Sequence, residues 1–134
     1  MKRLRRPTMP HDVASKVVGR ADTLCEALLP ASHCTGVAEV LHHRHLRSQG
    51  GKDTPSNLVH ICTRCHDWIH SNPKDAAALG LIIARGRPSE KAKILRRSRW
   101  VMLSDDGGIT PAGAPKSASV VDQIDWGETT KWQL

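Results

Sequence analysis

The stretch Cys62–His70, CTRCHDWIH, places two cysteines and two histidines at fixed spacings in a predicted helix that Asn72-Pro73 stops. Two residues separate Cys62 from Cys65, and this spacing lets both thiolates face one tetrahedral ion. His66 and His70 are four residues apart, so on a helix both imidazoles lie on one face, about one turn apart. The start of the helix therefore suits one metal ion, and its body suits a second.

Two predicted strands precede this helix, at residues 37–43 (VAEVLHH) and 58–61 (LVHI), with a polar loop over 44–57. The first strand ends on His42 and His43, and neighbouring side chains of a strand point to opposite faces. One imidazole can then bind a metal while the other takes a proton from water, because the ordinary pKa of histidine is near 6.5. The alternative is that these are scattered surface histidines.

A second cysteine pair is needed to complete a site with Cys62 and Cys65. Cys25 and Cys34 are the only other cysteines, and the eight residues between them must bulge out as a loop. Four thiolates leave no open coordination position, so the ion expected here is a structural Zn²⁺. Two alternatives remain: His33 replaces one cysteine as a ligand, or the first pair is ordinary buried cysteine and the second a chance pair.

Composition supports a small, metal-stabilised protein that binds polyanions. The chain has 134 residues with only 3% aromatic residues, so its core is modest and a metal staple is expected to help it fold. The net charge of +7 favours nucleic acid or an anionic membrane surface. No apolar stretch approaches a membrane span or a secretory signal. We therefore expect a cytoplasmic protein (in the host cytoplasm if it is phage-encoded), where clustered cysteines bind metal rather than form disulfides.

The remaining sequence predicts weaker elements around this centre. Residues 1–10 read as a basic arm, and residues 12–18 as a short helix with Asp12 as N-cap and Gly19 at its end. Residues 74–84 predict a short helix that leads into an apolar run, and residues 85–99 are strongly basic. A strand at 99–104 is expected to turn at Asp106-Gly107 into a hairpin. Residues 111–118 resemble a linker, and whether residues 111–134 are ordered is left open.

At these residues the chain resembles the HNH endonuclease family of ββα-metal nucleases. The resemblance runs from about Arg20 to Pro73, and its order and spacing are what make it specific. It rests on RAD before Cys25, then HHR, SQGG and NL, and finally CTRCHDWIH. The stretches HHRHLRSQGG, NL and CHDWIH are also similar to colicin-type DNases, which lack the cysteines. The pattern ALGLIIARG followed by RWVMLSDDGG resembles small HNH proteins of actinobacteria and their phages.

The resemblance implies a fold and a division of the chain. The expected fold is α+β, with a ββα-metal core, a four-cysteine zinc staple and a small C-terminal extension. The expected parts are an arm and short helix over 1–19, the nuclease domain over 20–74, and an extension over 75–134 that holds the basic segment, the hairpin and a tail. One departure is the wide spacing of the first cysteine pair, which concerns the loop between Cys25 and Cys34 and not the catalytic positions.

The resemblance also implies a role for each site residue. His43 matches the general base, and Asn57 matches the middle asparagine, which ties the loop and helps to orient the base. His42 and His66 match metal ligands, and His70 matches a third ligand of the colicin type; its alternative is a surface histidine without a specific partner. The implied catalytic metal is Mg²⁺ or a transition metal such as Mn²⁺, Ni²⁺ or Zn²⁺.

The implied function is hydrolysis of DNA to leave 5′-phosphate and 3′-hydroxyl ends. The expected substrate is double-stranded DNA. Basic residues are expected to contact phosphates, with solvated surface charge as the alternative for each. These expected DNA contacts are Arg44, Arg47, Arg85, Arg87, Arg96 and Arg97. Three rival functions are a zinc-stapled DNA-binding module with little activity, an accessory of phage DNA packaging beside a terminase, and a nuclease directed at RNA.

Overall fold

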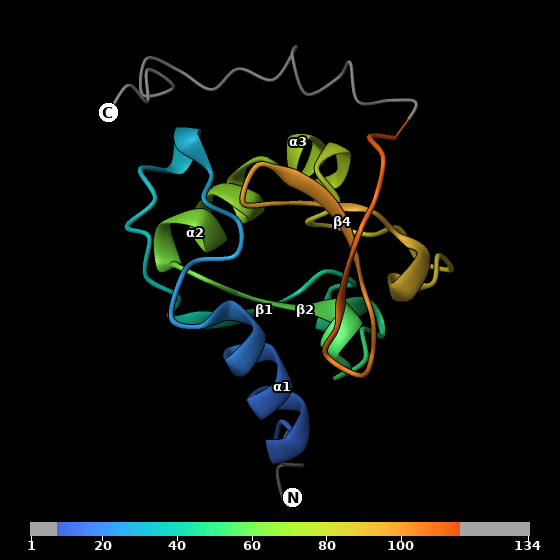
Figure 1. The fold of residues 1–134 in the computed structure, drawn as a ribbon. Helices are drawn as coiled ribbons and strands as arrows, with labels where there is room; N and C mark the ends of the chain where they lie inside the picture. Colours follow the sequence, from blue (N-terminus) through green and yellow to red (C-terminus); the bar gives the residue numbers. More distant parts are fainter. Residues whose placement is uncertain (1–7, 116–134) are drawn as a thin grey trace, which may run out of the picture.

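A two-stranded antiparallel ladder followed directly by a helix forms the centre of the fold (Figure 1). The computed structural model describes residues 8–115, and the predictions for residues 1–7 and 116–134 lie outside them. Strand β1 (Val40–His43) pairs with β2 (Leu58–Ile61), so that His43 faces Leu58 and His42 faces Val59. Helix α2 (Thr63–Ser71) begins two residues after β2. The predicted order of strand, loop, strand and helix is therefore confirmed.

Helix α1 (His11–Ala21) packs below this ladder in Figure 1, and α2 lies above it. The sequence predicted that Gly19 ends the first helix, and this is wrong. Val17 and Ala21 are four residues apart on one face and both are fully buried, so their packing outweighs the cost of a glycine inside the helix. The helix ends at Asp22, which takes the left-handed conformation.

The C-terminal segment adds a second sheet. Strands β3 (Ile94–Arg96), β4 (Arg99–Leu103) and β5 (Ile109–Pro111) are antiparallel in the order β3-β4-β5, which confirms the predicted hairpin. Strand β3 was not predicted, because it lies inside the basic stretch. Arg97 and Ser98, both with positive φ, make the tight turn between β3 and β4.

Helix α3 (Pro73–Ala78) is shorter than the predicted helix over 74–84. The chain turns at Gly80, where φ is +76° and a Cβ atom would lie 2.0 Å from the carbonyl oxygen of Lys93. Only glycine allows this close approach to the residue before β3. After this turn, the apolar run that follows α3 returns to strand β1. Leu81 therefore lies beside His42.

One buried cluster joins the ββα centre to the C-terminal segment. It contains residues from Cys25 to Leu103, and it includes side chains of β2, α2, β3 and β4. The mixed helix and sheet content agrees with the predicted α+β class. The division into an arm, a nuclease domain and an extension stays a prediction. No helix within residues 8–115 has both the length and the apolar character that a membrane span requires.

Candidate metal centres and active site

The four cysteines come together from three places in the chain. Cys62 is the N-cap of α2 and Cys65 lies in its first turn, while Cys25 and Cys34 flank a loop that contains a short 3-10 helix, Pro30–Ser32. The Sγ atoms of Cys25 and Cys65 are 3.7 Å apart, those of Cys34 and Cys62 are 3.6 Å apart, and all four lie within 4.8 Å of one another. Sulfur atoms on one tetrahedral zinc, with bonds of about 2.3 Å, are about 3.8 Å apart. The cluster therefore has the size of a zinc site.

Hydrogen-bond donors surround these sulfur atoms. Cys25 accepts from the backbone N–H of Leu28 and of Cys62, and Cys65 accepts from that of Leu29. Ser32, which the sequence analysis missed, places its hydroxyl 3.2 Å from the Cys65 sulfur. Such donors stabilise negative charge on sulfur, as a set of thiolate ligands requires.

The thiols cannot all ionise without a cation. The contact with Cys65 lowers the pKa of Cys25 to about 5, while the contact with Cys25 raises the pKa of Cys65, and burial raises the pKa of Cys34 to about 12. A first thiolate therefore keeps its neighbours protonated, unless a divalent ion balances the charge of all four. His33 lies outside this cluster and is exposed, which speaks against its role as a substitute ligand.

Three histidines form a second cluster. His42 at the end of β1 meets His66 and His70 on one face of α2, and one ring nitrogen of each lies within 4.8 Å of the others. The Nε2 atoms of His66 and His70 are 3.0 Å apart. Two nitrogens on one ion, with bonds of about 2.0–2.1 Å, are about 2.8–3.4 Å apart. His70 is exposed, but its ring lies against that of His66 at the spacing of two ligands on one ion.

The orientation of His42 is fixed by the C-terminal segment. Its Nε2 donates a hydrogen bond of 2.7 Å to the backbone carbonyl of Leu81, which leaves Nδ1 for a metal. Burial, followed by the charges of His66 and His70, lowers the pKa of His42 to about 4. Burial and His70 also lower the pKa of His66. Both imidazoles are therefore neutral at neutral pH, which is the form that binds metals.

His43 borders the same cavity, which has a volume of about 770 Å³ and is also lined by His42, His66 and His70. The Nε2 atom of His43 lies 2.7 Å from Oδ1 of Asp53, whose other oxygen is 3.7 Å from the Arg47 guanidinium. With Nε2–H donated to Asp53, Nδ1 is the nitrogen that is free to accept a proton. Asp53 was missed in the sequence because one acidic residue in a polar loop carries no distinctive spacing.

Asn57 does not contact His43 through its side chain. Its Oδ1 accepts from the backbone N–H of His45 at 2.7 Å, and its Nδ2 donates to the carbonyls of Lys52 and His45. Its own carbonyl accepts from the N–H of Arg44 at 2.7 Å, directly after His43. Asn57 therefore ties the loop between the strands, while the side chain that contacts His43 belongs to Asp53.

Arg44 was predicted to contact DNA, and the structure contradicts this. It is 0% exposed, and its guanidinium donates to backbone carbonyls throughout. The shortest of these bonds reach Gly80 at 2.8 Å, Ser56 at 2.9 Å and Ala92 at 2.8 Å. Arg44 thus joins the loop after β1 to the C-terminal segment.

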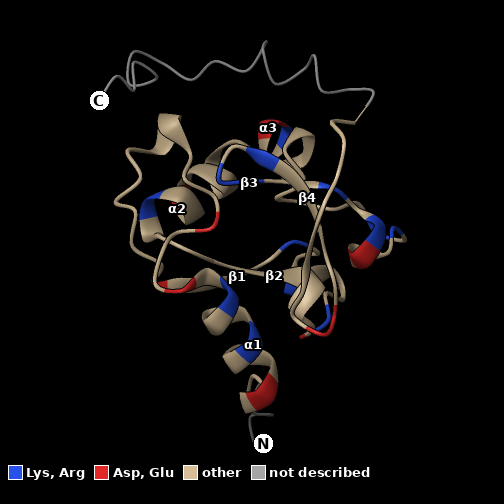
Figure 2. Ribbon diagram, in the orientation of Figure 1, with Lys and Arg blue, Asp and Glu red and all other residues tan. Residues whose placement is uncertain are grey.

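Arg96 and Arg97 are also turned inward. Arg96 donates to the buried carboxylate of Glu26 at 2.6 Å, and Arg97 donates to the carbonyls of Ala21 and Leu24. Both residues are partly buried, and their guanidinium groups are engaged inside the molecule, which weighs against a role as DNA contacts. Figure 2 shows Lys and Arg positions on helices, loops and strands alike.

Three of the predicted DNA contacts are exposed. Arg47 lies beside the histidine cavity, and Arg85 and Arg87 line a second cavity on the other side of the loop after β1. The structure therefore separates these arginines into inward-facing ones that hold the fold together and ones that lie at the surface beside a cavity.

Comparison with known proteins identifies one family. Residues 32–72 match the family model of the HNH endonuclease, a range that contains β1, β2, α2, three of the four cysteines and the whole histidine cluster. Among curated proteins no match is found, and none is found among solved structures. The matched residues are those around which both metal-sized clusters form. The segment from residue 32 to residue 72 is therefore similar to the HNH endonuclease family.

Proposed function

We propose that this protein is a metal-dependent endonuclease that hydrolyses phosphodiester bonds of DNA. The observation that carries the proposal is the convergence of His42, His66 and His70 in one cavity that His43 also borders. A DNA-binding module without catalysis would need the cysteine cluster and the positive charge but not this arrangement. Nuclease activity in general is what the family match supports.

The three imidazoles fit a catalytic divalent metal. His42, His66 and His70 would hold it, and three nitrogen ligands favour a transition metal such as Mn²⁺, Ni²⁺ or Zn²⁺, whereas cellular abundance favours Mg²⁺. Such an ion supplies Lewis acidity to a phosphate oxygen and stabilises the charge that develops on the leaving oxygen. Leu81 holds His42 in the orientation that this role needs.

His43 acts as the general base. Its bond to Asp53 fixes the tautomer that leaves a lone pair on Nδ1, and Asp53 stabilises the imidazolium that forms when water gives up its proton. Arg47 steadies Asp53 from the other side and adds positive charge beside the cavity. As water attacks the phosphorus atom, the bond from phosphorus to the 3′ oxygen breaks and that oxygen takes up a proton, so the products carry 5′-phosphate and 3′-hydroxyl ends, as the family resemblance implies.

The cysteine cluster would hold a structural zinc. The sulfur spacing and the N–H donors suit four thiolates, which leave no position for substrate. Its role is to join α2 to the segment before β1, so that the start of the helix that carries His66 is fixed. The proposed DNA contacts are Arg47, Arg85 and Arg87, and the net charge of +7 favours a polyanion.

The test is cleavage of supercoiled plasmid DNA by the purified protein with added Mg²⁺, Mn²⁺, Ni²⁺ or EDTA. His43→Ala is the test variant, and His11→Ala is the matched control because His11 is exposed at the start of α1. We expect cleavage that needs added metal, is unchanged in His11→Ala and falls by about 10²–10⁴-fold in His43→Ala, the range of general-base contributions. Circular dichroism and zinc content establish that each variant is folded.

Equal cleavage by His43→Ala would contradict the assignment of the base. DNA binding without cleavage under any of these metals would contradict the nuclease proposal itself. An RNA of matched length serves as a second substrate. Cleavage of RNA but not of DNA would show that the substrate is RNA.

A further inference from the structure

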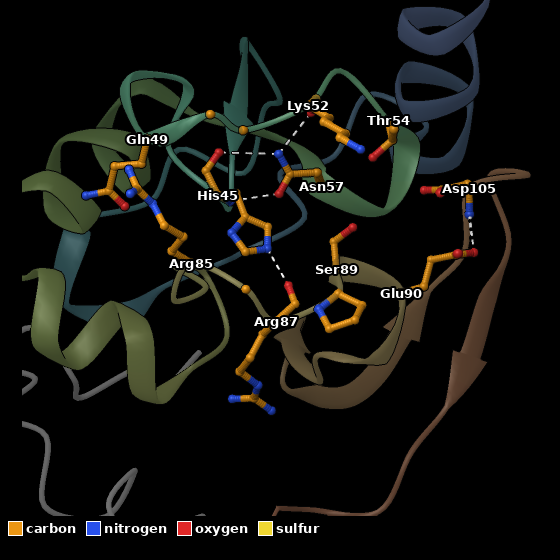
Figure 3. Close-up of a pocket in the computed structure, with 14 residues that line it drawn as sticks. His45, Gln49, Lys52, Thr54, Asn57, Arg85, Arg87, Ser89, Glu90 and Asp105 are labelled. Carbon is orange, nitrogen blue, oxygen red and sulfur yellow. Dashed lines mark hydrogen bonds between the residues drawn. The ribbon is translucent and has the colours of Figure 1, made fainter.

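A second cavity, of about 470 Å³, lies on the far side of the loop that follows β1 (Figure 3). One wall is this loop, with His45, Gln49 and Lys52, and the other is the segment over residues 85–90. Its volume is within the roughly 300–1,000 Å³ typical of sites for small ligands. Neither the histidine cluster nor the cysteine cluster borders it, so the proposed metal chemistry does not explain it.

The two walls are held in place before any ligand binds. The Nε2 of His45 donates to the carbonyl of Arg87 at 2.6 Å and so joins one wall to the other. Gly51 packs so closely that a Cβ atom there would lie 1.9 Å from the carbonyl oxygen of His45. Asn57 bonds the backbone of His45 and of Lys52 from behind. A cavity with walls fixed in this way loses little entropy when it is filled.

The polar groups of the cavity are unequally distributed. Figure 3 shows the guanidinium of Arg85 next to the Gln49 amide on one side, while Glu90 and Asp105 lie on the opposite side. Within residues 8–115, neither the guanidinium of Arg85 nor the ammonium of Lys52 has a hydrogen-bond or ion-pair partner, so both cationic groups are available to an anion. Glu90 is already engaged, because it accepts from the backbone N–H of Asp105 at 3.0 Å.

The loop itself connects this cavity to the metal cavity. Leu46, Arg47 and Ser48 line the histidine side, while His45 and residues 49–52 line the second cavity. The same loop therefore forms one wall of each cavity, and a strand that extends from the histidines to Arg85 would cross it.

We propose that the second cavity binds one nucleotide of the substrate strand, next to the phosphate that is cut, with the nucleotide's phosphate against Arg85 and its base inside. This inference rests on the proposed nuclease function and deepens it, because a base inside the cavity must be unstacked from its neighbours. It predicts a preference for DNA with an unpaired nucleotide beside the cleavage site.

The first experiment measures nucleotide binding without cleavage. Thymidine 5′-monophosphate, inorganic phosphate and thymidine are each titrated into the ¹⁵N-labelled zinc-bound protein with no other divalent metal. We expect thymidine monophosphate to shift the amide signals of Gly50, Gly51 and Gly86. We expect binding to weaken at least about tenfold in Arg85→Ala, the loss of one charge-assisted phosphate contact. Lys74→Ala is the control, since it removes an exposed cation of α3 outside the cavity.

Equal loss of binding in Lys74→Ala would show a general charge effect and would overturn the proposal. So would equal affinity for inorganic phosphate and thymidine monophosphate, because it would leave no role for the base. Signal shifts confined to His42, His66 and His70 would also refute it.

A second experiment separates this inference from the nuclease proposal. His43→Ala should bind thymidine monophosphate as the unsubstituted protein does, even though it does not cleave DNA. Cleavage of a duplex with one unpaired nucleotide should exceed cleavage of the fully paired duplex, and Arg85→Ala should remove this preference. Cleavage without any such preference would refute the cavity's role and leave the nuclease intact, whereas nucleotide binding without any cleavage would refute the nuclease.

Discussion

Arg44 offers the sharpest test, because its two possible roles predict opposite results. One role is the DNA contact expected from the sequence, and the other is the buried structural contact seen in the fold. In the structure it is fully buried and donates to the carbonyls of Gly80, Ser56 and Ala92. These contacts join the loop after β1 to the segment that carries Leu81, the partner of His42. The substitution to test is Arg44→Met, which keeps much of the aliphatic stem but removes every donor.

The expected loss of stability follows from these bonds. A hydrogen bond from a charged group contributes about 1.5–3 kcal/mol to stability. We expect each of the three short bonds of Arg44 to contribute at the low end of this range. Burial opposes them, since it lowers the pKa of Arg44 by disfavouring the charged form. Removal leaves buried carbonyls without donors, so we expect the free energy of unfolding to fall by about 3–5 kcal/mol.

The assay is equilibrium unfolding in urea, combined with DNA binding at two salt concentrations for the folded fraction. Arg47→Met is the control, because the Arg47 side chain is 37% exposed, beside the histidine cavity, whereas Arg44 is fully buried. We expect Arg44→Met to lose stability and Arg47→Met to lose DNA affinity. A loss of under about 1 kcal/mol in Arg44→Met, with weaker DNA binding and a smaller salt dependence, would refute the structural role and restore the predicted DNA contact.

Three further outcomes test other contacts. Asp53→Asn should lower the cleavage rate at saturating metal by about tenfold to a hundredfold, because His43 loses the carboxylate that fixes its tautomer, and an unchanged rate would count against this role. Cys65→Ser should lower the zinc content below about one ion per chain and lower the melting temperature, as measured by metal analysis and calorimetry; full zinc content would exclude the four-cysteine site. Glu26→Gln should cost about 3 kcal/mol at pH 7. Burial raises the pKa of Glu26, but the bonds from Arg20 lower it overall, so its stabilising effect is present above the ordinary carboxyl pKa and is lost as the pH falls through the lowered value. Urea unfolding at pH 7 and pH 3 should therefore show a difference that shrinks in acid, and an equal difference at both would contradict it.

The local part of the site could be predicted from the sequence. Cys62 and Cys65 lie within one turn, and His66 and His70 lie one turn apart, because helix geometry fixes residues three or four apart whatever surrounds them. The strand ending at His43 and the helix after β2 follow in the same way from apolar pattern and turn residues. The family resemblance added the roles of His43 and Asn57, which spacing alone does not assign.

Errors arose where a residue's environment comes from distant sequence. The basic segment was interpreted as surface, yet β3 forms within it, and Arg96 reaches Glu26 across 70 residues of chain. The sequence around a charged residue is the same whether its side chain faces solvent or a buried carboxylate. Gly19 was expected to end a helix that burial of Val17 and Ala21 continues. In each case tertiary packing outweighs a local preference of about 1 kcal/mol.

The sequence by itself determined which groups are available for chemistry and in what order they occur: paired cysteines, paired histidines on a helix, and two histidines at a strand end. Tertiary structure decided which of them meet and what orients them. The bond from His42 to Leu81, the bond from His43 to Asp53 and the burial of Arg44 each depend on where the chain returns after a loop. Short-range spacing is fixed by backbone geometry, but contacts between distant segments exist only once the core that brings them together has formed.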